Sequence, residues 1–293
     1  MQKMLVTGGA GFIGSNFIRL LLRKYDHLHI TNLDKLTYAG NLENLRDLKG
    51  NANYHFVKGD ICDGALVNEL MEGMDVVVNF AAESHVDRSI SGPDAFIRTD
   101  VFGAFTLLEA ARRCEVKKFV QISTDEVYGS TTGAGFKETD ALMPSSPYSA
   151  SKAGADRLAF SYFVTYNLPV ILTRCSNNFG PYQYPEKLIS LFVTNALEDK
   201  PLPIYGDGQY VRDWIHVEDH CAAIDFVLQH GVDGEAYNIG GGNERTNLEI
   251  TDFILSYLNK PHTLKTYVKD RPGHDRRYSL DCSKLVALGW KPK

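Results

Sequence analysis

Tyr148 and Lys152 stand four residues apart in the run PYSASKAGAD. In a helix, side chains at positions i and i+4 lie on the same face, so the lysine ammonium could stabilise a tyrosinate. Such a pair can remove the proton of a substrate hydroxyl. A second Tyr-x-x-x-Lys pair, Tyr54 and Lys58, falls in a strand-like run, where the two side chains would lie roughly 13 Å apart. We therefore discard the second pair. The first pair alone could equally be a contact on an exposed helix surface, but a glycine-rich dinucleotide motif earlier in the chain and the preceding Ser123 and Thr124 favour a catalytic site.

Two carboxyl groups, Asp125 and Glu126, follow Thr124 in the run STDEVYG. Elimination of water needs one group that removes a proton from carbon and another that protonates the departing hydroxyl. Adjacent carboxyls can divide this work if their environments separate their pKa values. For an isolated Asp-Glu pair, two solvated loop residues are the simpler interpretation.

A glycine-rich run, TGGAGFIGS, follows a short apolar run and precedes an amphipathic segment. Gly9, Gly11 and Gly14 satisfy G-x-G-x-x-G, and Gly8, Gly11 and Gly14 give the related three-residue spacing. These glycines permit a tight turn and let backbone N–H groups approach a pyrophosphate. The next predicted strand ends at Asp34, whose carboxylate could accept the ribose hydroxyls and would repel a 2′-phosphate, so NAD is favoured over NADP. Lys35 beside it weakens this preference slightly.

A bound NAD would also affect the pKa of Tyr148. A free tyrosine has a pKa near 10, and lowering it to about 7 requires about 4 kcal/mol of differential stabilisation. The lysine and a positively charged nicotinamide could supply this together in a partly desolvated site.

The elements that must position these residues alternate between strands and helices over the first half of the chain. The resulting expectation is an α/β fold with a doubly wound parallel (Rossmann) sheet. The predicted strands are Lys3–Thr7, His29–Asp34, Tyr54–Lys58, Asp75–Phe80, Lys118–Ser123 and Val170–Arg174. The predicted helices are Phe12–Lys24, Gly64–Glu72, Asp94–Cys114 and Tyr148–Asn167.

The second half is richer in proline, glycine and asparagine, which predicts a smaller, loop-rich C-terminal substrate domain. We assign residues 1–174 to an NAD-binding domain, to which residues 211–236 return. Residues 175–210 and 237–293 then form the domain that binds a sugar nucleotide.

Composition limits the class of protein. The apolar and charged fractions, 44% and 23%, are those of a globular protein, and a net charge of −5 argues against a nucleic-acid partner. The five cysteines are scattered without a CxxC pair, which favours free thiols in the cytoplasm and no metal site. Because no uncharged apolar run is long enough to cross a bilayer, we expect no membrane partner.

The motifs together resemble a known superfamily. TGGAGFIGS, the AAES run at Ala81–Ser84 and the Tyr148/Lys152 pair resemble the extended short-chain dehydrogenase/reductases that act on nucleotide sugars. Within it, STDEVYG, ESHVDRSI, NNFGPYQYPEKLI and RDWIHVEDH resemble the dTDP-glucose 4,6-dehydratase family over nearly the whole chain. The resemblance implies an NAD-dependent lyase that oxidises C4, eliminates water across C5 and C6, and returns the hydride to C6. It also implies a role in deoxysugar biosynthesis, for example of dTDP-rhamnose.

Residue roles are carried over by position. The resemblance implies Tyr148 as base in the oxidation with Lys152 as its electrostatic partner, and Thr124 as hydrogen-bond donor at O4. Asp125 is then the acid at the C6 hydroxyl and Glu126 the base at C5. A homodimer formed through helices 94–114 and 148–167 is also implied.

The predicted binding residues form two sets. Asp60 and Ile61 are placed to reach the adenine of the cofactor, but without the resemblance a simple turn after the strand would be the preferred interpretation of these two residues. The cofactor contacts are Gly8, Gly11, Phe12, Ile13, Gly14, Asp34, Lys35, Leu36, Thr37, Asp60, Ile61, Phe80, Ala81, Ala82, Ser84, Thr99, Tyr148, Lys152 and Asn178. The substrate contacts are Ser84, His85, Thr124, Asn177, Glu186, Lys187, Leu188, Pro203, Tyr205, Arg212, Asn247, Arg271 and His274, while Arg276 and Arg277 stay unassigned.

Three alternatives remain open from sequence. One is a dehydratase of another nucleotide sugar, such as a UDP- or CDP-linked one. The second is an NAD-dependent 4-epimerase, which needs no acid–base pair at C5 and C6. The third is a non-catalytic NAD-sensing protein on the same fold.

Overall fold

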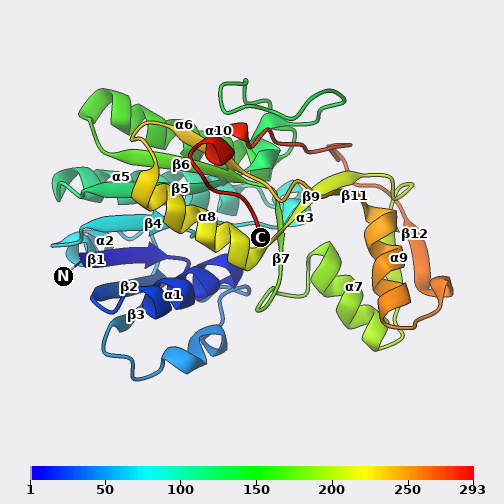
Figure 1. Cartoon of the computed structure of the whole chain (residues 1–293). Coiled ribbons are helices and arrows are strands. Elements are labelled where there is room, and N and C mark those ends of the chain that lie inside the picture. The colour runs from blue at the N-terminus through cyan, green and yellow to red at the C-terminus, as the bar shows by residue number, and fades with distance from the viewer. Residues whose placement is uncertain (1) are drawn as a thin grey trace.

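The computed structural model describes residues 2–293 and centres on a seven-stranded parallel sheet (Figure 1). The strand order is β10-β6-β5-β4-β1-β2-β3, so the chain winds outward from β1 in both directions. This confirms the predicted doubly wound α/β fold. The strands are β1 (Gln2–Thr7), β2 (Leu28–Asp34), β3 (Tyr54–Lys58), β4 (Val76–Asn79), β5 (Lys118–Thr124), β6 (Val170–Cys175) and β10 (Ala236–Ile239).

Helices cover both faces of this sheet, and each face has its own apolar core. On one face, α1 (Phe12–Lys24), η1 (Leu42–Leu48) and α8 (Val217–His230) pack over residues such as Val6 and Ile30. On the other, α2 (Gly64–Met71), α5 (Ala104–Arg113) and α6 (Pro147–Tyr166) pack over residues such as Leu5 and Phe119. Because alternate side chains of each central strand enter opposite cores, these strands read as continuous apolar runs.

The smaller lobe lies beyond the carboxyl ends of the large sheet's strands (Figure 1). A three-stranded sheet joins β7 (Asn177–Phe179), β9 (Val211–His216) and β11 (Glu244–Thr246), and a two-stranded one joins β8 (Leu202–Tyr205) to β12 (Lys265–Val268). α7 (Leu188–Leu197) and α9 (Asn247–Tyr257) enclose a third apolar core. The short elements that complete the chain are α3 (Val86–Ser91), η3 (Asp125–Tyr128), η4 (His262–Leu264) and α10 (Ser283–Ala287).

Two details of the large lobe differ from the sequence-based element ranges. β10 pairs with β6 and adds a seventh strand to the sheet. The predicted helix 94–114 consists of α4 (Asp94–Phe96), a π-helical segment η2 (Ile97–Gly103) and α5. The division into two domains stays a prediction. Within residues 2–293, no helix combines the length and apolar character needed to span a membrane.

Candidate active site

One cavity of about 540 Å³ lies where the carboxyl ends of the central strands meet the smaller lobe. All of the predicted site residues line it except Leu36. Leu36 has a positive φ of 57° and its backbone N–H donates to Asp34 Oδ1, so it shapes the loop after β2. In an open α/β sheet this edge is the usual place for ligands.

The glycine loop between β1 and α1 forms a close-fitting cradle at one end of the cavity. Gly8 has a φ of +70°, and an added Cβ there would lie 2.6 Å from the Ala81 backbone nitrogen. An added Cβ on Gly14 would lie 2.5 Å from the Gly8 carbonyl oxygen. α1 begins after Gly11 without a side-chain cap and without an acidic residue in its first turn. A helix start of this kind suits a pyrophosphate, so the loop fits NAD.

Replacing Gly14 with alanine is expected to weaken NAD binding at least about tenfold, which equals about 1.4 kcal/mol. The new methyl group would meet backbone atoms, which cannot move away as a flexible side chain could. Isothermal titration with NAD measures the effect. Gly64→Ala is the matched control, because its nearest neighbour would lie 3.9 Å away. Equal NAD affinity for both variants would contradict the assignment of the loop.

Asp34 at the end of β2 is buried and ties the glycine loop to its own strand. Its carboxylate accepts the Ala10 backbone N–H at 2.9 Å and the Leu36 backbone N–H at 2.8 Å. Burial raises the pKa of Asp34, and these two hydrogen bonds oppose the rise. Lys35 pairs with Asp60 at 2.7 Å, so its charge is already compensated within the protein. Because the charge of Lys35 is compensated by Asp60, it does little to attract a 2′-phosphate, and NAD remains the expected cofactor in preference to NADP.

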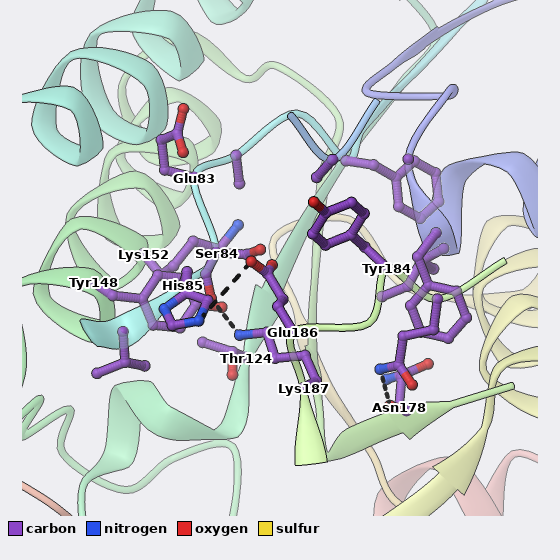
Figure 2. A pocket seen from close by; sticks show the side chains of 18 of the residues that line it. Glu83, Ser84, His85, Thr124, Tyr148, Lys152, Asn178, Tyr184, Glu186 and Lys187 are labelled. Atoms are coloured by element: carbon purple, nitrogen blue, oxygen red, sulfur yellow. Dashed lines mark hydrogen bonds and ion pairs between the residues drawn. The ribbon is translucent and has the colours of Figure 1, made fainter. Parts of the chain in front are cut away.

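Tyr148 and Lys152 lie in the first turns of α6, where Ser146 and Ser149 form a capping box. The Lys152 ammonium donates to the Ile122 carbonyl at 2.7 Å, and Tyr148 packs against Val86 and Phe96. Both side chains point toward the middle of the cavity (Figure 2). Burial, followed by the charges of Glu126 and Asp100, raises the pKa of Tyr148 well above its usual value. A ligand that brings a positive charge next to Tyr148 would oppose this rise.

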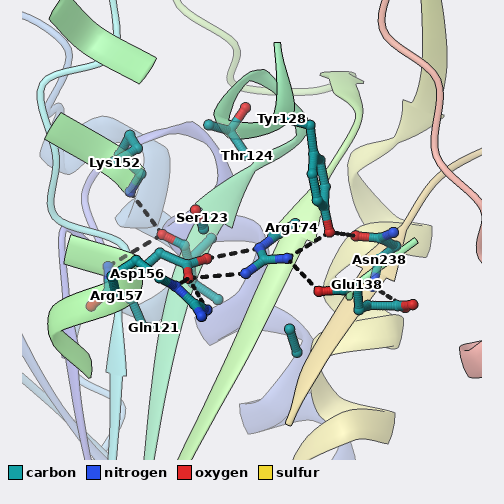
Figure 3. A network of polar contacts seen from close by, with 12 residues as sticks. Gln121, Ser123, Thr124, Tyr128, Glu138, Lys152, Asp156, Arg157, Arg174 and Asn238 are labelled. Atoms are coloured by element: carbon teal, nitrogen blue, oxygen red, sulfur yellow. Dashed lines mark hydrogen bonds and ion pairs between the residues drawn. The ribbon is translucent and has the colours of Figure 1, made fainter. Parts of the chain in front are cut away.

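A buried ion pair fixes the middle of α6 to the sheet (Figure 3). The Arg174 guanidinium donates to both oxygens of Asp156, at 2.9 and 3.0 Å, and neither side chain is exposed. Arg174 also donates to Tyr128 at 2.6 Å, and Tyr128 donates to Asn238 at 2.9 Å. The network joins α6, β6, η3 and β10, so it holds the catalytic helix in register with the end of β5.

Asp125 and Glu126 occupy different environments although they are neighbours. Asp125 is buried, and burial together with the charge of Glu126 raises its pKa well above the usual value. Its Oδ1 accepts a hydrogen bond from Thr124 at 3.1 Å, while its buried Oδ2 has no hydrogen-bond partner among residues 2–293. Glu126 is partly exposed to the cavity. The arrangement therefore favours the protonated form of Asp125 beside a second carboxyl group.

Several polar atoms at the other end of the cavity are buried without a partner in the described part of the chain. They are Asn177 Oδ1, Asn247 Oδ1 and Arg271 Nε. Since buried polar groups are normally hydrogen-bonded, their gathering around one cavity indicates a polar ligand. Arg212 is buried beneath this end, where it donates to the carbonyls of Val211 and Asp275.

His274 also lies at this end, stacked on Tyr210 with ring centroids 3.7 Å apart. Its Nδ1 lies 2.7 Å from Asp270 Oδ1. Burial lowers the pKa of His274 to about 4, so the ring is neutral near pH 7.

Glu186 and Lys187 connect the two lobes across the cavity (Figure 2). Lys187 donates to the Ser84 carbonyl at 2.6 Å, and Glu186 Oε2 lies 3.9 Å from His85 Nε2. Tyr38 donates to Glu186 Oε1 at 3.1 Å. The loop before α7 is thereby attached to the ends of β2 and β4.

The sequence-based predictions missed some residues of the site and left others unassigned. Tyr278 lines the cavity, and its hydroxyl lies 2.8 Å from Asp275 Oδ2 and 3.3 Å from Glu126 Oε2, so it can donate its one proton to either carboxylate. His220 Nδ1 lies 2.8 Å from Asn178 Oδ1, and burial lowers the pKa of His220 to about 3. In the sequence, the only indication of a role for Tyr278 is that it follows Arg276 and Arg277, and for His220 that it ends the RDWIHVEDH run. The unassigned arginines form ion pairs outside the cavity, Arg276 with Asp207 at 2.7 Å and Arg277 with Glu244 at 2.6 Å.

Similarity to known sequences and structures identifies the family of this chain. The sequence model described as GDP-mannose 4,6 dehydratase matches residues 5–293. The chain belongs to this 4,6-dehydratase family. The chain is 54% identical over 292 residues to the low-salt glycan biosynthesis protein Agl12 of Haloferax volcanii, covering 100% of this chain and 94% of Agl12. It is 52% identical over 314 residues to the dTDP-glucose 4,6-dehydratase of Xanthomonas campestris pv. campestris, covering 100% and 89% of the two chains.

A solved structure of a relative has the same fold as this chain. DesIV of Streptomyces venezuelae, a dTDP-glucose 4,6-dehydratase with NAD and TYD bound, superimposes with a TM-score of 0.98. The two sequences are 50% identical, and the match covers 100% of this chain and 92% of DesIV.

Proposed function

We propose that this chain is a dTDP-glucose 4,6-dehydratase, an NAD-dependent hydro-lyase that forms dTDP-4-keto-6-deoxyglucose and water. The observation that carries the proposal is the pairing of buried Asp125 with partly exposed Glu126 in the cavity that Tyr148 and Lys152 also line. An oxidation alone would need only the tyrosine and the lysine. Among nucleotide sugars we choose dTDP-glucose, because the Xanthomonas campestris relative and DesIV are dTDP-glucose 4,6-dehydratases.

The chain's own residues handle the protons of this reaction. Tyr148, as a tyrosinate stabilised by the Lys152 ammonium, takes the proton of the C4 hydroxyl. Once C4 is a ketone, the C5 proton is acidic; Glu126 removes it and returns a proton to C5 when the hydride adds at C6. Asp125, whose protonated form burial favours, donates a proton to the C6 hydroxyl as it leaves as water.

The cofactor is held by the glycine loop, Asp34, Asp60 and Asn178 in this proposal. Bound NAD supplies a hydride acceptor for C4 and afterwards a hydride donor for C6, so no external oxidant is needed. The two phosphates of the substrate are matched by Arg212 and Arg271, because guanidinium groups bind phosphate oxygens in pairs. The unpartnered amide oxygens of Asn177 and Asn247 offer acceptors for its hydroxyl or ring N–H groups.

The direct test is incubation of the purified chain with dTDP-glucose, followed by alkali to develop the chromophore of a 4-keto sugar. We expect the chromophore, together with a product that has lost one water. The same assay with UDP-, CDP- and GDP-linked glucose tests the base preference. If another nucleotide sugar is dehydrated faster, the assigned substrate is wrong. If none gives a 4-keto product, the assigned reaction is wrong.

The chain also carries an apolar surface that fits a homodimer. The segments η2, α5 and α6, which the family resemblance implies as the pairing helices, expose large apolar side chains. These side chains are Ile97, Phe102, Phe105, Val164 and Tyr166. Exposed apolar groups on neighbouring helices indicate a protein interface. We propose that two copies of the chain pair through α5 and α6.

Replacing Val164, which is 62% exposed, with aspartate is expected to convert the dimer to a monomer. A charge at the centre of an apolar interface would lose its hydration on association. Sedimentation velocity at micromolar concentration measures the change. Val232→Asp is the control, since Val232 is 59% exposed and lies after α8. A monomeric parent chain under these conditions would contradict the proposal.

The cellular role is also a proposal. A 4-keto-6-deoxy sugar nucleotide is a precursor of deoxysugars such as rhamnose. The five cysteines, all free, suit the reducing conditions of the cytoplasm.

A further inference from the structure

Asp100 is a buried carboxyl group that the proposed reaction does not use. It lies in the π-helical segment η2, which packs against α6, and it is 3% exposed. Its Oδ2 accepts the Ser151 hydroxyl at 2.7 Å and its Oδ1 accepts the Glu83 backbone N–H at 2.8 Å. Asp100 therefore connects η2 both to the turn of α6 that carries Lys152 and to the loop after β4.

Lys152 needs a compensating charge at this place. Its side chain is 5% exposed, and within residues 2–293 its ammonium has one hydrogen-bond acceptor, the neutral carbonyl of Ile122. Moving an ammonium group out of water is costly unless an opposite charge accompanies it. Burial lowers the pKa of Lys152, and the charge of Asp100 is the largest effect that opposes this lowering.

Two other acidic groups act on Lys152, and neither can supply the charge. Asp156 is already paired with Arg174 at 2.9 Å and with Arg157 at 2.5 Å. Burial raises the pKa of the Cys175 thiol to about 12, so this group is neutral near pH 7. Asp100 forms no direct ion pair among residues 2–293, and Lys152 is the cation that most strongly opposes the rise in its pKa.

We propose that Asp100 is the counter-ion of Lys152, and that through Ser151 it positions the turn of α6 that carries the catalytic pair. Asp100 is a positioning residue, because its contacts are to Ser151 and Glu83. The groups that face it are Lys152, Ser151 and Tyr148 from α6 and Glu83 from the loop after β4.

The pair makes stability depend on pH in a defined direction. Burial raises the pKa of Asp100 to about 6, against an ordinary value of 3.8, and Lys152 opposes the rise. A carboxyl whose pKa is higher in the folded state loses stability as pH rises from its unfolded to its folded pKa. Without Lys152 the folded pKa rises further, so this loss extends to higher pH.

The experiment is a double-variant cycle on unfolding of the full chain, followed by circular dichroism between about pH 5 and pH 8. It compares the parent chain, Lys152→Met, Asp100→Asn and the double variant. We expect the melting temperature of Lys152→Met to fall more steeply with rising pH than that of the parent. Adding Asp100→Asn should remove this extra slope and make the double variant melt above Lys152→Met at the upper pH.

Asp94→Asn combined with Lys152→Met is the matched control, because Asp94 is an exposed carboxyl group on the neighbouring α4. This control should leave the slope of Lys152→Met unchanged. Additive effects of Asp100→Asn and Lys152→Met at every pH would overturn the proposal, since a purely structural Asp100 predicts them. If Asp100→Asn alone fails to fold, the test is whether the melting temperature of Lys152→Met falls more steeply with rising pH than that of the parent. An equal slope would overturn the proposal. Neither NAD nor a nucleotide sugar is needed, so the outcome is independent of the proposed reaction.

Discussion

Replacing Glu126 with glutamine is expected to lower formation of the 4-keto-6-deoxy product by about 10²- to 10⁴-fold, the usual contribution of a general base. Glutamine preserves the size of the side chain and can still accept the hydrogen bond from Tyr278, which lies 3.3 Å from Glu126. It cannot take the C5 proton. The buried acid, Asp125, would remain in place. The variant should therefore lose exchange of the C5 proton with deuterated water while it still binds NAD and substrate.

Glu72→Gln is the control for this variant, because Glu72 is exposed at the end of α2 and remote from the cavity. It should turn over at the rate of the parent chain. The 4-epimerase alternative makes the opposite prediction for Glu126→Gln, since epimerisation does not require a base at C5. Turnover close to that of the parent would therefore favour an epimerase and contradict the role of Glu126.

Replacing Tyr148 with phenylalanine is expected to lower turnover by about 10²- to 10⁴-fold through loss of the base in the oxidation step. The ring packs against Val86 and Phe96, with 6.2 Å between the Tyr148 and Phe96 centroids, and phenylalanine can keep that packing. The fold and NAD affinity should thus be retained. Steady-state turnover and isothermal titration with NAD separate the two properties.

Tyr162→Phe on the same helix is the matched control. The Tyr162 hydroxyl donates to Glu109 at 2.7 Å and is not among the residues that line the cavity. This control should leave turnover unchanged. A Tyr148→Phe variant as active as the parent would favour a non-catalytic NAD-sensing protein, because only that alternative has no use for the hydroxyl.

The local elements were predictable because their periodicity is local. Strand Tyr54–Lys58 and helix Phe12–Lys24 have the predicted bounds, and the predicted strand ends place Thr124 and Asp34 at the edge where the cavity lies. β10 was missed because a strand of four residues, one of them the polar Asn238, carries a weak signal, and its pairing with β6 is set by a distant segment. The π-helical turns of η2 escaped because an amphipathic pattern does not distinguish them from an α-helix.

The supporting residues of the site depend on tertiary contacts and could not be predicted in the same way. Tyr278 meets Glu126 across 152 residues of sequence, and Asp100 meets Ser151 across 51. Neither has a spacing that implies chemistry on its own. The contrast between Asp125 and Glu126 is similar, because neighbours in sequence acquire different environments only when the fold buries one of them.

Mass spectrometry of the product formed from dTDP-glucose in deuterated water tests the central claim most directly, namely that Glu126 and Asp125 convert an oxidation site into one for elimination. We predict a 4-keto sugar nucleotide that is one water lighter than the substrate and carries one deuterium, at C5. The hydrogen from C4 should reappear at C6 and should not exchange with the solvent. A product of the same composition as the substrate, without deuterium at C5, would contradict the account.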